Sequence, residues 1–229
     1  MEIINTPATA QVEEAGKGVD LSRRRFFQMA GGMAGAGLLF AACKGSAPTD
    51  IYVGSGDTGL LNYLYILQQL EAAFYTQAVA TPYYGLTASE EALLTELRDT
   101  EVAHREFFKK MLGADAVRNV EVNFSPVTFA DRTSFLSNAI IIEDLMVAAM
   151  NGVVKLFTDT KYILIIAKMA PVEARHAAYS RDLLTRNSFA DATAVNSNGL
   201  DLASSPLTVM NSAQTYLQSR FDTSKLPSY

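Results

Sequence analysis

The length, composition and charge of the chain set the first limits on its fold and function. It has 229 residues, 49% of them hydrophobic, and a formal net charge of −5 at pH 7, which predicts one domain with a sizeable core and argues against nucleic acid as a partner. The single cysteine, Cys43, excludes an internal disulfide and a site built from several thiolates, and no stretch after residue 43 is long and uncharged enough for a membrane span.

Residues 1–43 are predicted to be an export signal. Within them, residues 22–28, SRRRFFQ, precede an uncharged run rich in Gly and Ala, which is too short to cross a bilayer as a stable helix. The core around Arg23 and Arg24 resembles the twin-arginine signal, and this resemblance implies that the protein is exported folded, with any metal already bound. The alternative is a basic segment before an apolar helix of the domain, which the glycine content disfavours.

Cys43 ends the apolar run in LLFAAC, which resembles the cleavage site of bacterial lipoproteins, where a lipidated cysteine becomes the new N-terminus. Phe40 stands where such sites usually carry Leu. The resemblance implies a membrane tether through Cys43, and both signals together predict a location in the periplasm or on the outer side of a membrane. Residues 44–57, rich in Gly, Ser, Pro and Asp, are predicted to be a linker.

Helical periodicity predicts a domain of four long helices over residues 58–187. The first helix is apolar on most sides, as expected for a helix that packs against several neighbours. Thr87 and Glu90 form a capping-box signature before the second. The helices are expected at about residues 58–80, 90–112, 132–157 and 159–186.

Two other segments complete the predicted organisation. Residues 113–130 are β-branched and interrupted by Pro126, which predicts a long connection between the second and third helices. Residues 188–229 are predicted to be a C-terminal extension, with one short amphipathic helix around residues 212–221.

Two of the predicted helices carry the same arrangement, a Glu followed three residues later by a His. The chain has only two histidines, and both lie in this arrangement, as Glu101 with His104 and Glu173 with His176. Positions three apart share one face of a helix, and here that face is apolar. Burying several such groups without cations would cost too much, and Glu oxygen with His nitrogen suits iron or manganese. A single Glu-x-x-His is more often a surface pair, so the joint pattern carries the prediction.

The other two helices each place a glutamate, Glu71 and Glu143, among apolar residues. One Glu from each of two helices and a Glu-x-x-His from each of two others is the ligand arrangement of ferritin-like di-iron or di-manganese bundles. With this order and the phrases LNYLYILQQLEAAFY, IEDLMVAAMNG and VEARHAAY, the sequence resembles the ferritin-like superfamily, closest to its exported, desiccation-related branch. The resemblance implies an all-α, antiparallel four-helix bundle with a long crossover between helices two and three, which holds two Fe or Mn ions.

The resemblance also implies which side chains bind the metals. They are Glu71, Glu101, His104, Glu143, Glu173 and His176. One departure concerns the first helix, where the usual ligand position, seven residues before a Tyr, falls on Gln68. Glu71 lies about 60° round the helix from Gln68, so either Glu71 or, in its place, Gln68 as a neutral ligand completes the set. Tyr75, which defines this spacing, is expected to be a core residue.

The resemblance implies oxidase-type chemistry with dioxygen or peroxide as the partner. The expected outcome is ferrous iron oxidation or peroxide removal in envelope stress defence. The alternative is a non-enzymatic stress-related protein that uses the bundle as a scaffold, with or without a metal.

Overall fold

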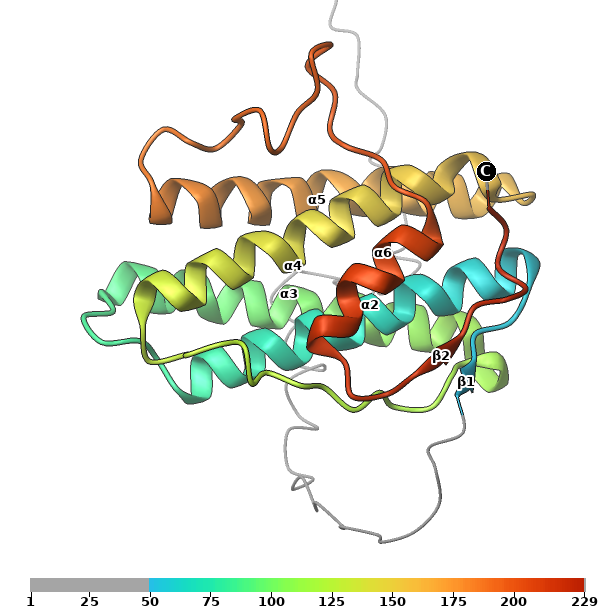
Figure 1. The fold of residues 1–229 in the computed structure, drawn as a ribbon, viewed down its shortest axis with the longest axis horizontal. Helices are drawn as coiled ribbons and strands as arrows, with labels where there is room; N and C mark the ends of the chain where they lie inside the picture. Colours follow the sequence, from blue (N-terminus) through green and yellow to red (C-terminus); the bar gives the residue numbers. More distant parts are fainter. Residues whose placement is uncertain (1–49, 229) are drawn as a thin grey trace, which may run out of the picture. The chain divides into compact units, whose positions relative to one another are not determined.

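The computed structural model describes residues 50–228, and within them the fold is mostly α-helical. Figure 1 shows the long helices lying side by side, which confirms the all-α prediction. The predicted export signal, with Arg23, Arg24 and Cys43, lies outside the described residues. The long helices are α2 Gly56–Ala80, α3 Ala88–Leu112, α4 Arg132–Val153 and α5 Thr160–Leu184.

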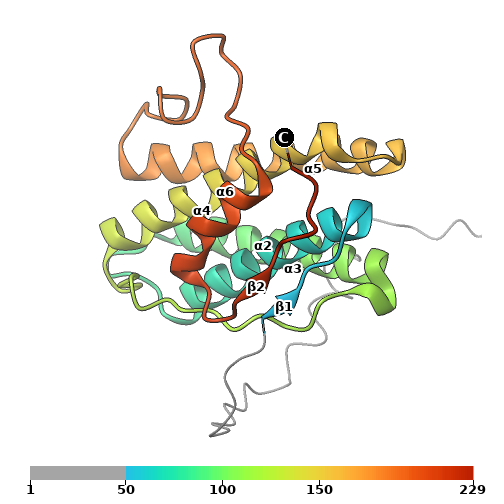
Figure 2. The same cartoon turned by 45° about the vertical axis from the view of Figure 1, so that its right-hand side comes forward.

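The long helices form a bundle of two hairpins. α2 packs chiefly on α3, α4 packs chiefly on α5, and contacts between α2 and α4 join the two hairpins. Short connections, residues 81–87 and 154–159, make the two helices of each hairpin antiparallel neighbours (Figures 1 and 2). The chain crosses from one hairpin to the other through residues 113–131, which begin with a 3-10 turn. The predicted long crossover is therefore confirmed.

Side-chain caps fix where the helices begin. The predicted capping box forms, because the Glu90 backbone N–H donates to Thr87 Oγ1 at 3.3 Å and the Thr87 backbone N–H donates to Glu90 Oε2 at 3.0 Å. Asp131 and Asp159 accept from backbone N–H groups in the first turns of α4 and α5. Such caps satisfy N–H groups that the helix itself leaves without partners.

The core of the bundle is centred on α2. This helix is buried along most of its length, which agrees with its apolar character on most sides. At its C-terminal half, Phe74 stacks on Phe135 with ring centroids 5.4 Å apart and meets Tyr75 edge-on at 5.3 Å. None of the helices in residues 50–228 is both long and apolar enough to cross a membrane.

The C-terminal extension packs on the bundle, but the prediction for its short helix is wrong by several residues. The sequence predicts this helix around residues 212–221, whereas α6 is Pro206–Ala213 and packs on α4. The reason is local. Ser205 caps α6 by accepting from the Thr208 N–H at 3.3 Å, and Pro206 fits the first turn, where an N–H has no helical partner.

The predicted linker also ends earlier than residue 57. β1, Ile51–Tyr52, pairs in parallel with β2, Phe221–Asp222, near the end of the chain. α2 already begins at Gly56. Ile51 and Val53 are buried. Removing their apolar side chains from water stabilises the packing of this segment on the fold. Residues 44–49 of the predicted linker lie outside the described part of the chain.

Candidate metal centre

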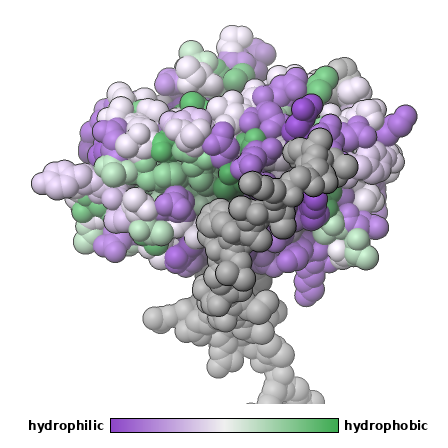
Figure 3. All heavy atoms as spheres, turned by 60° about the horizontal axis from the view of Figure 1, so that its bottom comes forward, coloured by the Kyte–Doolittle hydropathy of each residue, from purple (hydrophilic) through white to green (hydrophobic). Residues whose placement is uncertain are grey.

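Among residues 50–228, four glutamates are buried, one on each long helix. Glu71 lies on α2, Glu101 on α3, Glu143 on α4 and Glu173 on α5, and none is more than 1% exposed. Charged side chains normally stay in water, and Figure 3 shows hydrophilic residues over much of the face that it draws. Burying an ionised carboxylate costs several kcal/mol unless other groups compensate. The buried glutamates therefore need either neighbouring positive charge or protons bound to their carboxyl groups.

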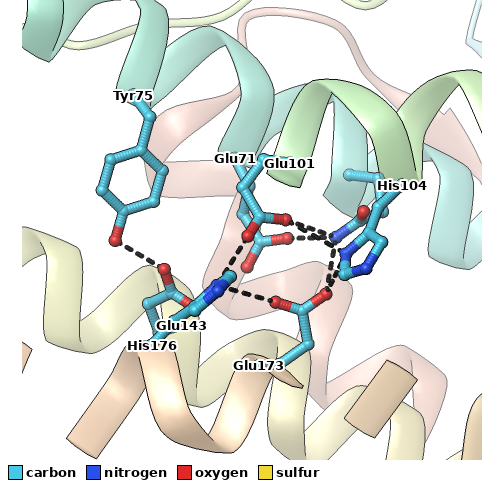
Figure 4. Close-up of polar contacts among 8 residues, drawn as sticks. Glu71, Tyr75, Glu101, His104, Glu143, Glu173 and His176 are labelled. Carbon is cyan, nitrogen blue, oxygen red and sulfur yellow. Dashed lines mark hydrogen bonds and ion pairs between the residues drawn. The ribbon is translucent and has the colours of Figure 1, made fainter. Parts of the chain in front are cut away.

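Both histidines lie beside these glutamates (Figure 4). His104, one turn after Glu101 on α3, places Nδ1 2.8 Å from Oε1 of Glu173 and 3.5 Å from Oε2 of Glu101. His176, one turn after Glu173 on α5, places Nδ1 2.7 Å from Oε1 of Glu101 and 3.5 Å from Oε2 of Glu173. Each of these two glutamates therefore presents one oxygen to each histidine. A carboxylate that bridges two cations has its two oxygens divided in the same way.

Glu143 completes the group around His176. We call the atoms around His176 Nδ1 the His176 side of the cluster, and those around His104 Nδ1 the His104 side. Glu143 places Oε2 3.8 Å from His176 Nδ1, and its Oε1 accepts a hydrogen bond from the Tyr75 hydroxyl at 2.5 Å. The group that could hold a metal ion, with one donor atom from each residue and all four atoms within 4.8 Å of one another, is Glu101, Glu143, Glu173 and His176.

Both candidate ligands on α2 lie in the cluster, but in different ways. Gln68 is fully buried, and its Nε2 donates to Oε2 of Glu71 at 2.5 Å, to Oε2 of Glu101 at 3.2 Å and to Oε1 of Glu173 at 3.2 Å. Glu71 is thus joined to the other helices through Gln68, and it is not in the group of four described above. The structure therefore brings all six predicted ligands together, and the alternative ligand Gln68 lies beside them.

Several buried atoms of the cluster have no hydrogen-bond partner among the described residues. They are Oε1 of Gln68, Glu71 and Glu101, Oε2 of Glu143 and Glu173, and Nδ1 of both histidines. The Nδ1 atoms lie close to carboxylate oxygens, but these contacts lack the geometry of hydrogen bonds. Leaving a buried polar atom unpaired costs about 1–3 kcal/mol. A cation among these atoms would remove that cost, so the residues present fit a metal.

The pKa values show how the cluster balances its charge without a metal. Burial opposes ionisation of Glu101, but the two imidazoles outweigh it and lower its pKa to about 2. Burial also opposes charge on the histidines, yet neighbouring carboxylates raise the pKa of His104 to about 10 and that of His176 to about 11. Burial raises the pKa of both Glu71 and Glu143 well above its usual value. A metal ion that binds here therefore displaces protons.

The hydroxyl of Tyr75 has a role in the cluster that the sequence prediction missed. Tyr75 is fully buried, as expected of a core residue, but its hydroxyl also donates to Glu143. Burial, followed by the charge of Glu143, raises the pKa of Tyr75 well above its usual value, so the proton stays on the hydroxyl. A signal was present in the sequence, since Tyr75 stands four residues after Glu71 and so shares its face of α2.

A helical bundle with a buried Glu on every helix and a His one turn after two of them defines the ferritin-like class of proteins. In a comparison with protein families, the ferritin-like domain family matches residues 56–186. The match covers more than half of the chain and includes the whole cluster, so the chain belongs to the ferritin-like domain family. No curated protein matches the chain. The exported, desiccation-related branch and the twin-arginine signal stay predictions.

Proposed function

We propose that this chain is an exported protein that holds iron or manganese inside its bundle and couples the oxidation of ferrous iron to the reduction of peroxide. The observation that supports the proposal is the convergence of buried carboxylate oxygens and imidazole nitrogens that have no hydrogen-bond partner among residues 50–228. Carboxylate and imidazole ligands together suit iron and manganese, and both metals change oxidation state readily.

Glu101, Glu143, Glu173 and His176 would hold the ion, which supplies one-electron oxidation and reduction at a buried position. Glu101 and Glu173 contact both histidines, so they hold the two sides of the cluster together. Tyr75 fixes one oxygen of Glu143 by a hydrogen bond and leaves the other oxygen facing His176. Such outer contacts orient a ligand and raise metal affinity.

Ferrous oxidation and peroxide removal are the two halves of one balanced reaction. Hydrogen peroxide accepts an electron from each of two ferrous ions together with two protons, its O–O bond breaks, and two waters and two ferric ions result. The glutamates are fully buried, whereas the side chains of His104 and His176 are 15% and 12% exposed, so small reactants can approach by the histidines.

Metal analysis and turnover of the full chain test this proposal. Protein from cells supplied with iron and manganese is expected to contain one of these metals and to accelerate ferrous oxidation by peroxide. Glu101→Gln is the matched variant, because it keeps the size of the side chain and removes the carboxylate that both histidines contact. A metal-free wild-type protein with no turnover would contradict the proposal.

The second candidate function is a stress-related scaffold that works without catalysis. The contacts of Gln68 favour it, because the amide holds three carboxylates of the cluster by hydrogen bonds alone. This candidate predicts that the purified protein does not accelerate ferrous oxidation by peroxide, and in its metal-free form that the protein contains no iron or manganese and that Glu101→Gln leaves its function in stressed cells unchanged. Metal analysis together with the turnover assay therefore separates the two candidates.

The proposal of export rests on residues 1–43. Replacing both Arg23 and Arg24 by Lys is expected to keep the protein in the cytoplasm, because the resemblance to the twin-arginine signal depends on this pair. Cys43→Ala is expected to release the exported protein from the membrane fraction. Export of the double Lys variant would contradict the route, and wild-type protein found free of the membrane would contradict the tether.

A further inference from the structure

The two sides of the cluster differ in their hydrogen bonds. On the His176 side, the facing atoms are Oε1 of Glu101, Oε2 of Glu143, Oε2 of Glu173 and Nδ1 of His176, and none of them has a hydrogen-bond partner among residues 50–228. Three of these four atoms belong to carboxyl groups. Buried acceptors are normally satisfied by donors or cations, so this side matches the needs of a single cation.

On the His104 side, the corresponding carboxylate oxygens are already paired. Oε2 of Glu101 and Oε1 of Glu173, the two oxygens that face His104 Nδ1, each accept a hydrogen bond from Gln68 Nε2 at 3.2 Å. The same nitrogen donates to Oε2 of Glu71 at 2.5 Å. The amide nitrogen therefore lies among three carboxyl groups from three helices. A bound cation would have the same kind of surroundings.

The orientation of the Gln68 amide follows from charge. An amide can be turned over so that its oxygen exchanges places with its nitrogen, but the oxygen would then face three carboxyl groups without offering them a donor. With the nitrogen inward, its two N–H groups supply partial positive charge. A metal ion bound to the same oxygens would lie roughly 2 Å from each and would face the amide hydrogens, which repel it.

We infer that the amide of Gln68 takes the place of a second cation, so that each chain binds one metal ion, on the His176 side. The inference rests on the proposed function in one respect, because it requires that the cluster binds metal. It replaces the two ions that the family resemblance implies by one. A Glu at position 68 would add an anionic ligand and free the oxygens of Glu101 and Glu173 that face His104.

Metal stoichiometry of the wild-type chain and of Gln68→Glu tests the inference. Each full chain is dialysed against Mn²⁺ under reducing conditions, bound manganese is counted per chain, and electron paramagnetic resonance shows whether bound ions are isolated or coupled in pairs. Gln77→Glu is the matched control, since it adds the same charge at an exposed position of the same helix. The expected result is one isolated ion in the wild type and in the control, and a coupled pair in Gln68→Glu.

The other possible metal counts separately test the one-ion inference, the proposed function and the role of the Gln68 amide. Two ions in the wild type would overturn the inference and leave the proposed function standing, whereas no ion would overturn both. One ion in a folded Gln68→Glu variant would overturn the role of the amide. If thermal unfolding shows that Gln68→Glu does not fold, Gln68→Leu decides the question, because it removes the amide without adding charge. Retention of one ion by Gln68→Leu supports the inference, and loss of that ion overturns it, since Gln68 would then be a ligand.

Discussion

The two Glu-x-x-His motifs have the same spacing, yet their surroundings differ. The oxygens that face His104 accept hydrogen bonds from Gln68, whereas those that face His176 have no such donor among the described residues and are joined by Glu143. The spacing within each motif sets the pairing of its own Glu and His. What that pair can bind depends on a side chain from a neighbouring helix, α2 on one side and α4 on the other.

The largest effect is expected from Glu101, which contacts the histidines of both sides. Glu101→Gln should weaken Mn²⁺ binding by more than about 100-fold, beyond the loss usual for an outer contact. Titration calorimetry of the full chain measures this loss. Affinity within about tenfold of the wild type would show that Glu101 is not a ligand.

A matched pair of histidine variants compares metal binding on the two sides of the cluster most directly. His176→Ala should weaken Mn²⁺ binding by more than about 100-fold, whereas His104→Ala should weaken it by less than about tenfold, because the oxygens near His104 are held by Gln68. The same titration measures both variants. Equal losses would show that the two sides bind metal alike.

Tyr75→Phe tests how Glu143 is held on the His176 side. It removes the hydroxyl that donates to Glu143 Oε1 and should lower metal affinity by about 10–100-fold, as loss of an outer hydrogen bond does. Tyr216→Phe is the control, because Tyr216 is also buried and donates its hydroxyl to Asn138 Oδ1 at 2.7 Å, outside the cluster. If both variants bind metal equally well, the Tyr75 contact does not position Glu143.

A substitution of Gly152 on α4 tests whether metal binding depends on how the C-terminal extension packs on the bundle. A Cβ at this position would lie 1.9 Å from the backbone oxygen of Ser204, so Gly152→Ala should destabilise the fold by about 1–3 kcal/mol through overpacking. Chemical denaturation measures the free energy of unfolding. The variant should still bind one ion on the His176 side, and a change in metal stoichiometry would link the extension to the cluster.

The smallest expected effect is a change in stability when Glu90 is substituted. Glu90 lies outside the cluster, so this variant is a control for charge. Burial opposes its ionisation, but hydrogen bonds from Thr87 and Arg132 outweigh it and lower its pKa to about 2 from the usual 4.5. Its carboxylate therefore stabilises the fold above about pH 4.5, and this contribution is lost as the pH falls toward 2.

Glu90→Gln should remove this pH dependence. The contribution is expected to be less than about 1 kcal/mol, because the ion pair with Arg132 lies near the surface. Urea midpoints of the two metal-free proteins should differ at neutral pH and converge in acid. A difference that stays constant from neutral pH to acid would contradict the lowered pKa.

Helical spacing made most of the cluster predictable from the sequence. A Glu and a His three residues apart must share a helix face, and an apolar stripe directs that face inward, so the placement of Glu101, His104, Glu173 and His176 follows from local rules. The donors of Gln68 were not predictable, because they depend on how α2, α3 and α5 pack and on which end of an amide faces the carboxyl groups.

The errors outside the cluster have local and long-range causes. The amphipathic pattern predicted the C-terminal helix too late, because the cap at Ser205 and the proline after it outweighed that pattern. The pairing of β1 with β2 joins two short segments far apart in the sequence, and two-residue strands carry almost no periodic signal.

The β1–β2 pair has a mechanical consequence if the protein is tethered through its N-terminal segment. Before the chain enters α2, the backbone N–H groups of Ile51 and Val53 donate to the carbonyl oxygens of Arg220 at 2.8 Å and Asp222 at 3.1 Å, near the C-terminus. A pulling force from an anchor upstream would first load these backbone hydrogen bonds, and the metal-binding helices would bear it only after the strands had separated.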